Sequence, residues 1–184
     1  MTPAPWRSAF RTKLFLTSLS AALVALAVAG VLFATAIERR TNARIESSLV
    51  SEARMLAQML GSGSAERSPA ELNLEAHRLG EVLGARVTLI ARDGRVVGDS
   101  AEALESLPRM ENHGSRPEVL AALRDGVGVA RRSSTTIGID MLYVAAPVRL
   151  PGLAFVRLAL PLTEVRQQLQ DVLRATFTAL VVAR

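Results

Sequence analysis

Residues that could do chemistry gather near the middle of the chain, where Glu111, Asn112 and His113 are followed by Arg116. Glu111 and His113 are two residues apart, which suits a strand or loop and not a pair of helical metal ligands. No second histidine is nearby in the sequence, so we expect His113 to hydrogen-bond backbone at a loop–helix junction and not to hold a metal ion. Arg116 precedes a helix start, where free amides favour anions. It would hold an anionic ligand there or pair with Asp99 or Glu111, and we favour the ion pair.

Little else in the sequence suggests reactivity. The chain has no cysteine, which removes disulfides, thiolate nucleophiles and cysteine-based zinc sites together. No nucleophile–base pair, phosphate-cradling loop or paired-carboxylate site stands out, and Asp93 is explained by the turn that it makes with Gly94. Tyr143 is expected in the core, with its hydroxyl bonded to one buried partner. We therefore expect no catalytic residue, no metal and no cofactor in this chain.

The elements around these residues begin with an uncharged apolar stretch from Leu14 to Ile37. At about 1.5 Å per residue its helix would reach roughly 36 Å, enough to cross a bilayer core of about 30 Å. Ala34-Thr35-Ala36 would fit the cleavage site of a signal peptide, but the apolar stretch is too long for one, so we favour an uncleaved membrane anchor. The basic residues on both flanks leave its orientation open.

The charge distribution argues against nucleic acid as a partner. The net charge is +5, yet acidic and basic residues nearly balance between Glu38 and Arg174. The excess lies at the two ends, beside apolar segments. This is the pattern of membrane-flanking charge and not of a phosphate-binding surface.

A helical pattern continues beyond the apolar stretch, with Ile45, Leu49, Leu56 and Met59 at helical spacing and the polar Glu52 among them. Two interpretations are equally supported. The helix packs on its own domain, or it pairs with a partner chain.

Turn and cap signals predict the next elements. Ser68 to Glu71 forms a capping box that opens a helix reaching about Leu83, with Gly84 as its cap. An Asp93-Gly94 turn joins the strands 86–91 and 95–98 into a hairpin. A short helix and a loop occupy 101–115, and a helix from Pro117 to Arg124 ends before a glycine.

Three more strands are predicted at 127–135, 141–148 and 153–160, and a Pro151-Gly152 turn makes the last two antiparallel neighbours. Arg131 and Arg132 fall on opposite faces of their strand, so at least one should be solvated. The set predicts an α+β domain with a five-stranded antiparallel sheet.

From Leu162 the period becomes helical again, with Val165 and Leu169 on the same stripe. This helix runs into an apolar segment too short to span a bilayer. We interpret it as the beginning of a second membrane helix, cut short. A complete protein ending in a buried helix is the alternative.

Three strings follow one another in the predicted domain. They are VTLIARDGRVVGDS at 87–100, MENH at 110–113 with RPEV at 116–119, and LYVAAPV at 142–148. In this order they resemble the extracytoplasmic sensor of PhoR-type, phosphate-regulon sensor histidine kinases, over roughly residues 79–165. No string is specific by itself, but the combination is fairly specific.

The resemblance implies a PAS-like, Cache-related fold, a homodimer in the bacterial inner membrane, and a cytoplasmic kinase core after the second span. ATP, Mg and the response regulator would belong to that absent core, because neither His77 nor His113 sits in a phospho-acceptor context. An unknown ligand or partner protein would act outside the cytoplasm. The candidate sensor residues are Asp99, Glu111, Asn112, His113, Arg116 and Tyr143; the candidate transmission residues are Ile45, Leu49, Leu56, Leu162, Val165 and Leu169.

The predicted organisation is a cytoplasmic tail (1–13), a transmembrane helix (14–37), a membrane-proximal helix and loop (38–67), an extracytoplasmic PAS-like domain (68–161), an exit helix (162–174) and the start of a second transmembrane helix (175–184). The predicted function is the signal-input region of a two-component sensor histidine kinase. Two alternatives remain: the same sensor on a chemoreceptor or nucleotide cyclase, and a membrane-anchored binding or envelope protein.

Overall fold

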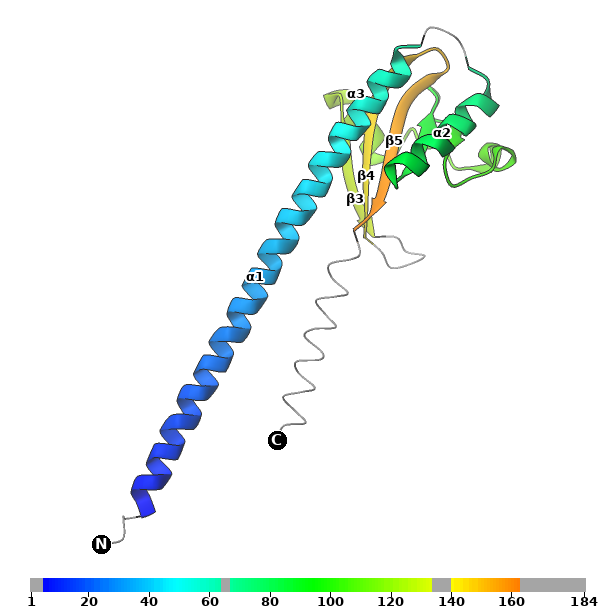
Figure 1. The fold of residues 1–184 in the computed structure, drawn as a ribbon. Coiled ribbons are helices and arrows are strands. Elements are labelled where there is room, and N and C mark those ends of the chain that lie inside the picture. The colour runs from blue at the N-terminus through cyan, green and yellow to red at the C-terminus, as the bar shows by residue number, and fades with distance from the viewer. Residues whose placement is uncertain (1–4, 64–66, 134–139, 163–184) are drawn as a thin grey trace. The chain divides into compact units, whose positions relative to one another are not determined.

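The computed structural model describes residues 5–63, 67–133 and 140–162 (Figure 1). Helices and strands alternate along the chain much as the turn and cap signals predict. The elements are α1 (Pro5–Gly61), α2 (Pro69–Leu83), β1 (Arg86–Ile90), β2 (Val96–Asp99), the 3-10 helix η1 (Leu104–Arg109), α3 (Pro117–Asp125), β3 (Gly128–Ser133), β4 (Asp140–Leu150) and β5 (Leu153–Pro161).

Helix α1 is continuous through the predicted anchor and the helix that follows it. Residues 1–42 form one unit and residues 43–184 a second. The most apolar 18-residue window of α1 has a mean hydropathy of 2.3, and none of it is buried. Large side chains such as Leu26 and Phe33 are 70% and 69% exposed. Helix α1 is thus long and apolar enough to span a membrane.

The last turns of α1 belong to the second unit and pack on its sheet. Leu49, Leu56 and Leu60 are 3%, 4% and 1% exposed, which confirms that this helix packs on its own domain. The predicted stripe is wrong at Met59, which is 46% exposed. The next buried leucine after Leu56 is Leu60, one helical turn later. Met59 is therefore displaced from the buried stripe toward solvent.

All five strands form one antiparallel sheet in the order β2-β1-β5-β4-β3. The predicted fold class, α+β with a five-stranded antiparallel sheet, is confirmed. Strand β4 is longer than predicted, because its ladder with β5 continues past a register shift between Pro147 and Leu150. The turn that follows contains Gly152 at a φ of 79°, a conformation that glycine adopts without strain.

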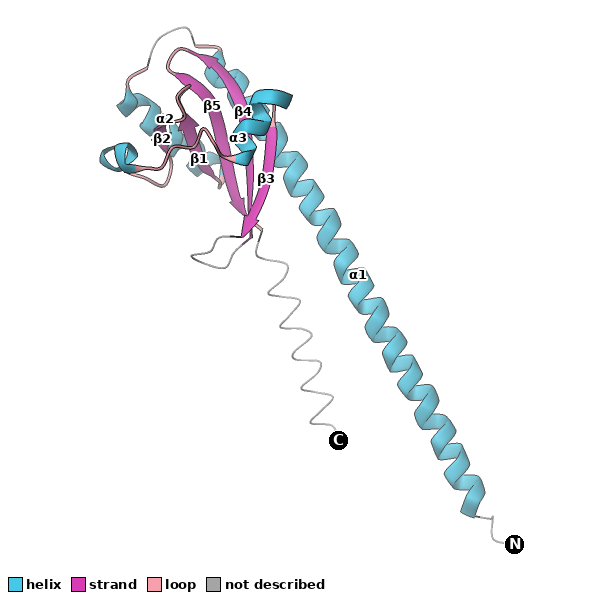
Figure 2. Ribbon diagram, turned by 180° about the vertical axis from the view of Figure 1, so that it is seen from behind, coloured by secondary structure: helices cyan, strands magenta, loops and turns pink. Residues whose placement is uncertain are grey.

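The two faces of the sheet carry different cores. Helices α1 and α2 cover one face, and α3 lies on the other, as Figure 2 shows with α3 in front of the strands. The first face is apolar throughout, with Val87, Leu142, Val144, Val156 and Leu158 completely buried. The face under α3 has only a small apolar cluster of Ile90, Val119, Ala122 and Ala145.

Local capping follows the sequence closely. The Ser68 hydroxyl accepts from the Glu71 amide at 3.3 Å, and the Glu71 carboxylate accepts from the Ser68 amide at 2.8 Å, so the predicted capping box is present. Gly84 and Gly126 end α2 and α3 in the left-handed conformation. The helices that have clear capping residues in the sequence therefore begin and end where these residues indicate.

The predicted exit helix and second span lie outside the described residues, as do Val165 and Leu169 of the transmission stripe. Leu162 is described. It is partly buried against the core of the α1 face, and its amide donates to the Asp140 carbonyl at 2.7 Å.

Candidate functional site

One row of residues crosses the whole sheet on the face covered by α3. Thr88 pairs in register with Asp99 on one side and Arg157 on the other; Arg157 pairs with Ala145, and Ala145 with Gly128. Thr88, Asp99 and Arg157 are buried polar residues, at 0%, 0% and 6% exposure. Burying such groups is unfavourable unless each finds a partner. The row therefore needs polar groups above it.

Helix α3 supplies these polar groups, and Gly128 allows the helix to lie close enough to the sheet to do so. A Cβ at Gly128 would overlap the carbonyl oxygen of Glu118 and lie 2.6 Å from the amide of Ala122. Any larger residue would push the helix off the sheet. The close approach buries Glu118 completely, at 0% exposure, within hydrogen-bond distance of Arg157 at the middle of the row.

Glu118 is the centre of a polar cluster. Its Oε1 accepts from Nε of Arg157 at 2.8 Å and from a terminal nitrogen of Arg132 at 2.9 Å. The Arg157 side chain is 8% exposed and the Arg132 side chain 29%. Burial lowers the pKa of Arg157, and the hydrogen bond and charge of Glu118 oppose that shift. Two guanidinium groups thus share a single carboxylate oxygen.

Tyr143 lies between the same two arginines. Its ring centroid is 4.3 Å from Cζ of Arg132 and 4.4 Å from Cζ of Arg157, so both cations contact the aromatic ring. The prediction of a core tyrosine is wrong: Tyr143 is half-buried, because its position in β4 faces α3 and not the apolar core.

Arg131 and Arg132 occupy opposite faces, and Arg131 is exposed to solvent as predicted of at least one of them, although both also have a carboxylate partner. Arg131 pairs with Glu46 of α1 at 2.7 Å and Arg132 with Glu118 of α3. Each face of the strand meets a helix that carries a carboxylate.

The Glu-Asn-His string fastens a loop to the β1–β2 turn. The Asn112 amide donates to the Asp93 carbonyl at 2.8 Å, and its side-chain oxygen accepts from the Gly114 amide at 2.8 Å. The His113 amide donates to the Gly94 carbonyl at 2.9 Å, and its carbonyl accepts from the Arg116 amide at 3.1 Å. His113 does lie at the predicted loop–helix junction, but these bonds are made by its own backbone, and Nδ1 of its ring has no hydrogen-bond partner among the described residues.

The His113 ring is only 7% exposed. The pKa of His113 is lowered from 6.5 to about 4, first by burial and then by the positive charges of Arg157 and Arg116, while the negative charges of Asp99 and Glu118 oppose the shift. The ring is therefore neutral at physiological pH. We call Glu118, Arg132, Tyr143, Arg157 and His113 the α3-face cluster.

Three buried atoms of this cluster have no hydrogen-bond partner in the described part of the chain: Nδ1 of His113, Oε2 of Glu118 and Nε of Arg132. Buried polar atoms are nearly always bonded to protein, water or ligand. The cluster therefore has unused polar capacity. A cavity of about 600 Å³ on the α3 side is lined by residues that include Gly114 and Val119, the chain neighbours of His113 and Glu118, but by none of the five cluster residues themselves.

The other predicted sensor residues have structural partners. The Asp99 carboxylate accepts from Nε of Arg86 at 2.9 Å, from Thr88 at 2.8 Å and from the Ala101 amide at 2.9 Å. Arg116 pairs with the 81% exposed Glu111 at 2.6 Å, which is the favoured ion pair. The alternative pairing with Asp99 is not the one formed.

Sequence reasoning missed three members of the cluster, Glu118, Arg132 and Arg157. A lone arginine between Val156 and Leu158 in an otherwise apolar strand was a usable signal, because buried strands tolerate a charge only with a partner. Glu118 carried no such signal, since an acidic residue in the first turn of a helix is ordinary.

Within residues 5–63, 67–133 and 140–162 no group of three His, Asp or Glu residues could hold a metal ion. The α3-face cluster contains donors, an acceptor and an aromatic ring, but no nucleophile beside a base. Its chemistry suits binding.

A long helix on one face of a five-stranded antiparallel sheet, with a short helix and loops on the other, is a Cache-like α+β arrangement. A family profile described as single Cache-like matches residues 41–161. The chain belongs to the single Cache-like family. Comparison with curated protein sequences gives no significant match.

Solved sensor domains share this fold. The ligand-binding domain of the Campylobacter jejuni chemoreceptor Tlp3, in complex with 4-methylisoleucine, is 14% identical with a TM-score of 0.55, over 68% of this chain and 54% of that one. The Pseudomonas aeruginosa amino acid chemoreceptor PctC, in complex with GABA, is 19% identical with a TM-score of 0.50, over 76% and 61%. The Vibrio cholerae histidine kinase DctB sensor domain is 19% identical with a TM-score of 0.44, over 72% and 59%. The chain spans little more than half the length of each.

The buried ion pair should carry much of the domain's stability. In Glu118→Gln, Arg157 stays buried without a counter-charge, and we expect the free energy of unfolding to fall by about 3–5 kcal/mol. The matched control, Glu111→Gln, breaks an exposed pair and should cost no more than about 1 kcal/mol. Urea unfolding of the full chain in detergent, followed by circular dichroism, measures both. Equal losses in the two variants would contradict the central place of Glu118.

Stability should also fall in mild acid because of His113. The unfolded chain binds a proton on this residue near pH 6.5, whereas the folded chain keeps it neutral down to about pH 4. Between these values the unfolded state binds more protons, so stability decreases as the pH drops from 6.5 to 4. The slope of the unfolding free energy against pH measures how many more protons the unfolded chain binds. Across this range the slope should be steeper in the parent chain than in His113→Gln, by an amount equivalent to up to about one proton. Parallel curves would show that His113 titrates normally.

Proposed function

We propose that this chain is the signal-input region of a two-component sensor histidine kinase, which passes an extracytoplasmic stimulus to a cytoplasmic kinase core outside these residues. The observation that carries the proposal is a single Cache-like domain whose core includes the last turns of a helix able to span a membrane. A kinase output is favoured by the ordered strings of residues 87–148 that resemble PhoR-type sensors.

The stimulus binds at the α3-face cluster. Arg132 and Arg157 outnumber the one carboxylate of Glu118, so the cluster is complementary to an anionic group, and the partnerless atoms offer further donors and an acceptor. A cavity of about 600 Å³, lined by Gly114 and Val119 next in sequence to His113 and Glu118, falls in the size range of small-molecule sites. Two proteins of similar fold are described in complex with 4-methylisoleucine and GABA, both small molecules. A small molecule with a carboxylate fits these features best.

Transmission follows from the shared core. Leu49 and Leu56 of α1 pack on the opposite face of the strands that carry Tyr143 and Arg157. A ligand that prefers one packing of α3 on the sheet would bias the position of α1 and of the membrane segment it continues into. The bias cannot exceed the ligand's difference in affinity for the two arrangements, ordinarily about 1–3 kcal/mol. We propose a homodimer in the bacterial inner membrane as the signalling unit.

A chemoreceptor output is the second candidate. It is favoured by the chemoreceptor domains among the structures of similar fold. The same sensor mechanism would apply, with a different cytoplasmic partner.

The proposed topology can be tested by cysteine labelling, because the chain has no native cysteine. Val82 is 83% exposed on α2, so Val82→Cys should react with a membrane-impermeant maleimide in intact cells. Thr2→Cys should react only after the membrane is permeabilised. The parent chain is the unlabelled control. Labelling of Thr2→Cys alone in intact cells would reverse the proposed orientation.

The signalling role can be tested by joining residues 1–184 to the cytoplasmic half of a characterised histidine kinase. Arg132→Gln disturbs the α3-face cluster, and we expect it to change the autophosphorylation rate in membrane vesicles by about fivefold or more. Arg78→Gln removes an exposed arginine of α2 and should leave the rate unchanged. A chimera that responds identically to both substitutions would argue against a signal-input role.

A further inference from the structure

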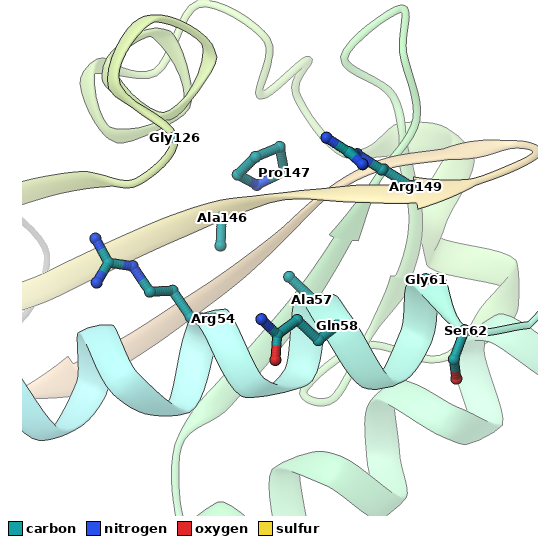
Figure 3. Close-up of a pocket in the computed structure, with 9 residues that line it drawn as sticks. All are labelled: Arg54, Ala57, Gln58, Gly61, Ser62, Gly126, Ala146, Pro147 and Arg149. Atoms are coloured by element: carbon teal, nitrogen blue, oxygen red, sulfur yellow. The ribbon is translucent and has the colours of Figure 1, made fainter.

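A second groove lies away from the α3-face cluster, between the last turns of α1 and strand β4. Its volume is about 550 Å³. Figure 3 shows Arg54 and Arg149 at opposite ends, with small apolar side chains between them. The lining residues are Arg54, Ala57, Gln58, Gly61 and Ser62 from α1 and its end, Gly126, and Ala146, Pro147 and Arg149 from β4.

The groove follows an edge of the sheet that does not suit strand addition. Strand β3 begins at Gly128, opposite Ala145, so β4 from Ala146 to Leu150 has no β3 partner. Pro147 has no amide hydrogen to offer there, and the register shifts between Pro147 and Leu150. Proline and local irregularity are how natural edges avoid pairing with another strand. An extended peptide is therefore a poor occupant.

The charges of the groove point to an anion. Arg54 and Arg149 are both exposed, and the side chain of neither makes a hydrogen bond or ion pair with any residue that the structure describes. Other exposed arginines, such as Arg78, share this property, but these two line one groove.

The C-terminal end of α1, which carries the partial negative charge of the helix dipole, lies beside this groove, and some of its backbone carbonyls accept hydrogen bonds. The Ser62 amide donates to the Gln58 carbonyl at 3.0 Å, and the Ser62 hydroxyl donates to the Met59 carbonyl at 2.7 Å. These bonds engage two of the last carbonyls of α1, but the helix end stays negative, so an anion here must be held by the guanidinium groups.

We propose that this groove is a second ligand site, which binds a small oxyanion-bearing molecule, a carboxylate or phosphate, through Arg54 and Arg149. Guanidinium groups match both oxyanions in bidentate geometry. The floor of Ala57, Ala146 and Pro147 accommodates a short carbon skeleton between the two ends. A ligand held by both arginines ties α1 to β4. The site is independent of the α3-face cluster and of the proposed kinase output.

The test is isothermal titration calorimetry of the full chain in nanodiscs, with citrate and inorganic phosphate as separate probes. For citrate, whose carboxylates can reach both ends of the groove, Arg54→Gln and Arg149→Gln should each weaken binding about tenfold or more, because each removes a charge-assisted contact; for phosphate, which contacts one end, one of the two should do so. The matched control Arg78→Gln removes an exposed arginine from α2 and should bind like the parent. Saturable binding of citrate would assign the site to carboxylates. Saturable binding of phosphate without binding of citrate would assign it to phosphoryl groups.

A steric variant separates groove binding from general charge. Gln58→Trp fills the groove from an exposed position of α1 and leaves both arginines in place. It should abolish binding of either probe, with far-ultraviolet circular dichroism confirming the fold. Parent-like affinity in Gln58→Trp, equal weakening by Arg78→Gln, or no saturable binding of either probe would overturn the proposal.

Discussion

The ion pair between Glu118 and Arg157 is the constraint on which the α3 face of this domain depends. Neither charge can be buried alone without a large cost, so helix and sheet must stay in contact for either to be stable. Gly128 makes the contact possible, since a side chain at that position would meet the backbone of α3. The glycine, the carboxylate and the guanidinium are thus one structural unit, although they come from β3, α3 and β5.

The domain has an asymmetric design as a result. One face of the sheet is joined to α1 and α2 mainly by aliphatic side chains, with an ion pair between Arg131 and Glu46 and a hydrogen bond from the Asp99 amide to Asn73 beside them. The other face holds polar groups with unused bonding capacity. In the proposed function, a stimulus would act on the polar face, and the apolar face would pass the change to α1, which is long and apolar enough to span a membrane.

The Glu-Asn-His string shows how a motif can matter without touching a ligand directly. Asn112 and the backbone of His113 hold the loop on the β1–β2 turn, and this places the imidazole beside Arg157 and Glu118. Glu111 stays at the surface, where it pairs with Arg116. The three neighbours therefore have three different tasks: surface pairing, loop fastening and filling the polar site.

The sequence by itself determined the local elements: the capping box at Ser68, the glycine-ended helices, the Asp93-Gly94 hairpin and the long apolar helix. These features depend on neighbours a few residues apart, so their signals are visible in a single chain. The five-stranded antiparallel sheet was predicted from the number of strand-like segments and from the tight turns at Asp93-Gly94 and Pro151-Gly152. Only the tertiary structure decided which polar residues are buried. Glu118 and Arg157 are 39 residues apart in the sequence. No local sequence pattern distinguishes a glutamate that is buried against the sheet at Gly128 from a glutamate that is exposed to solvent. The burial of a charge is set by the partner that the fold brings to it, and that partner is not a local property of the sequence.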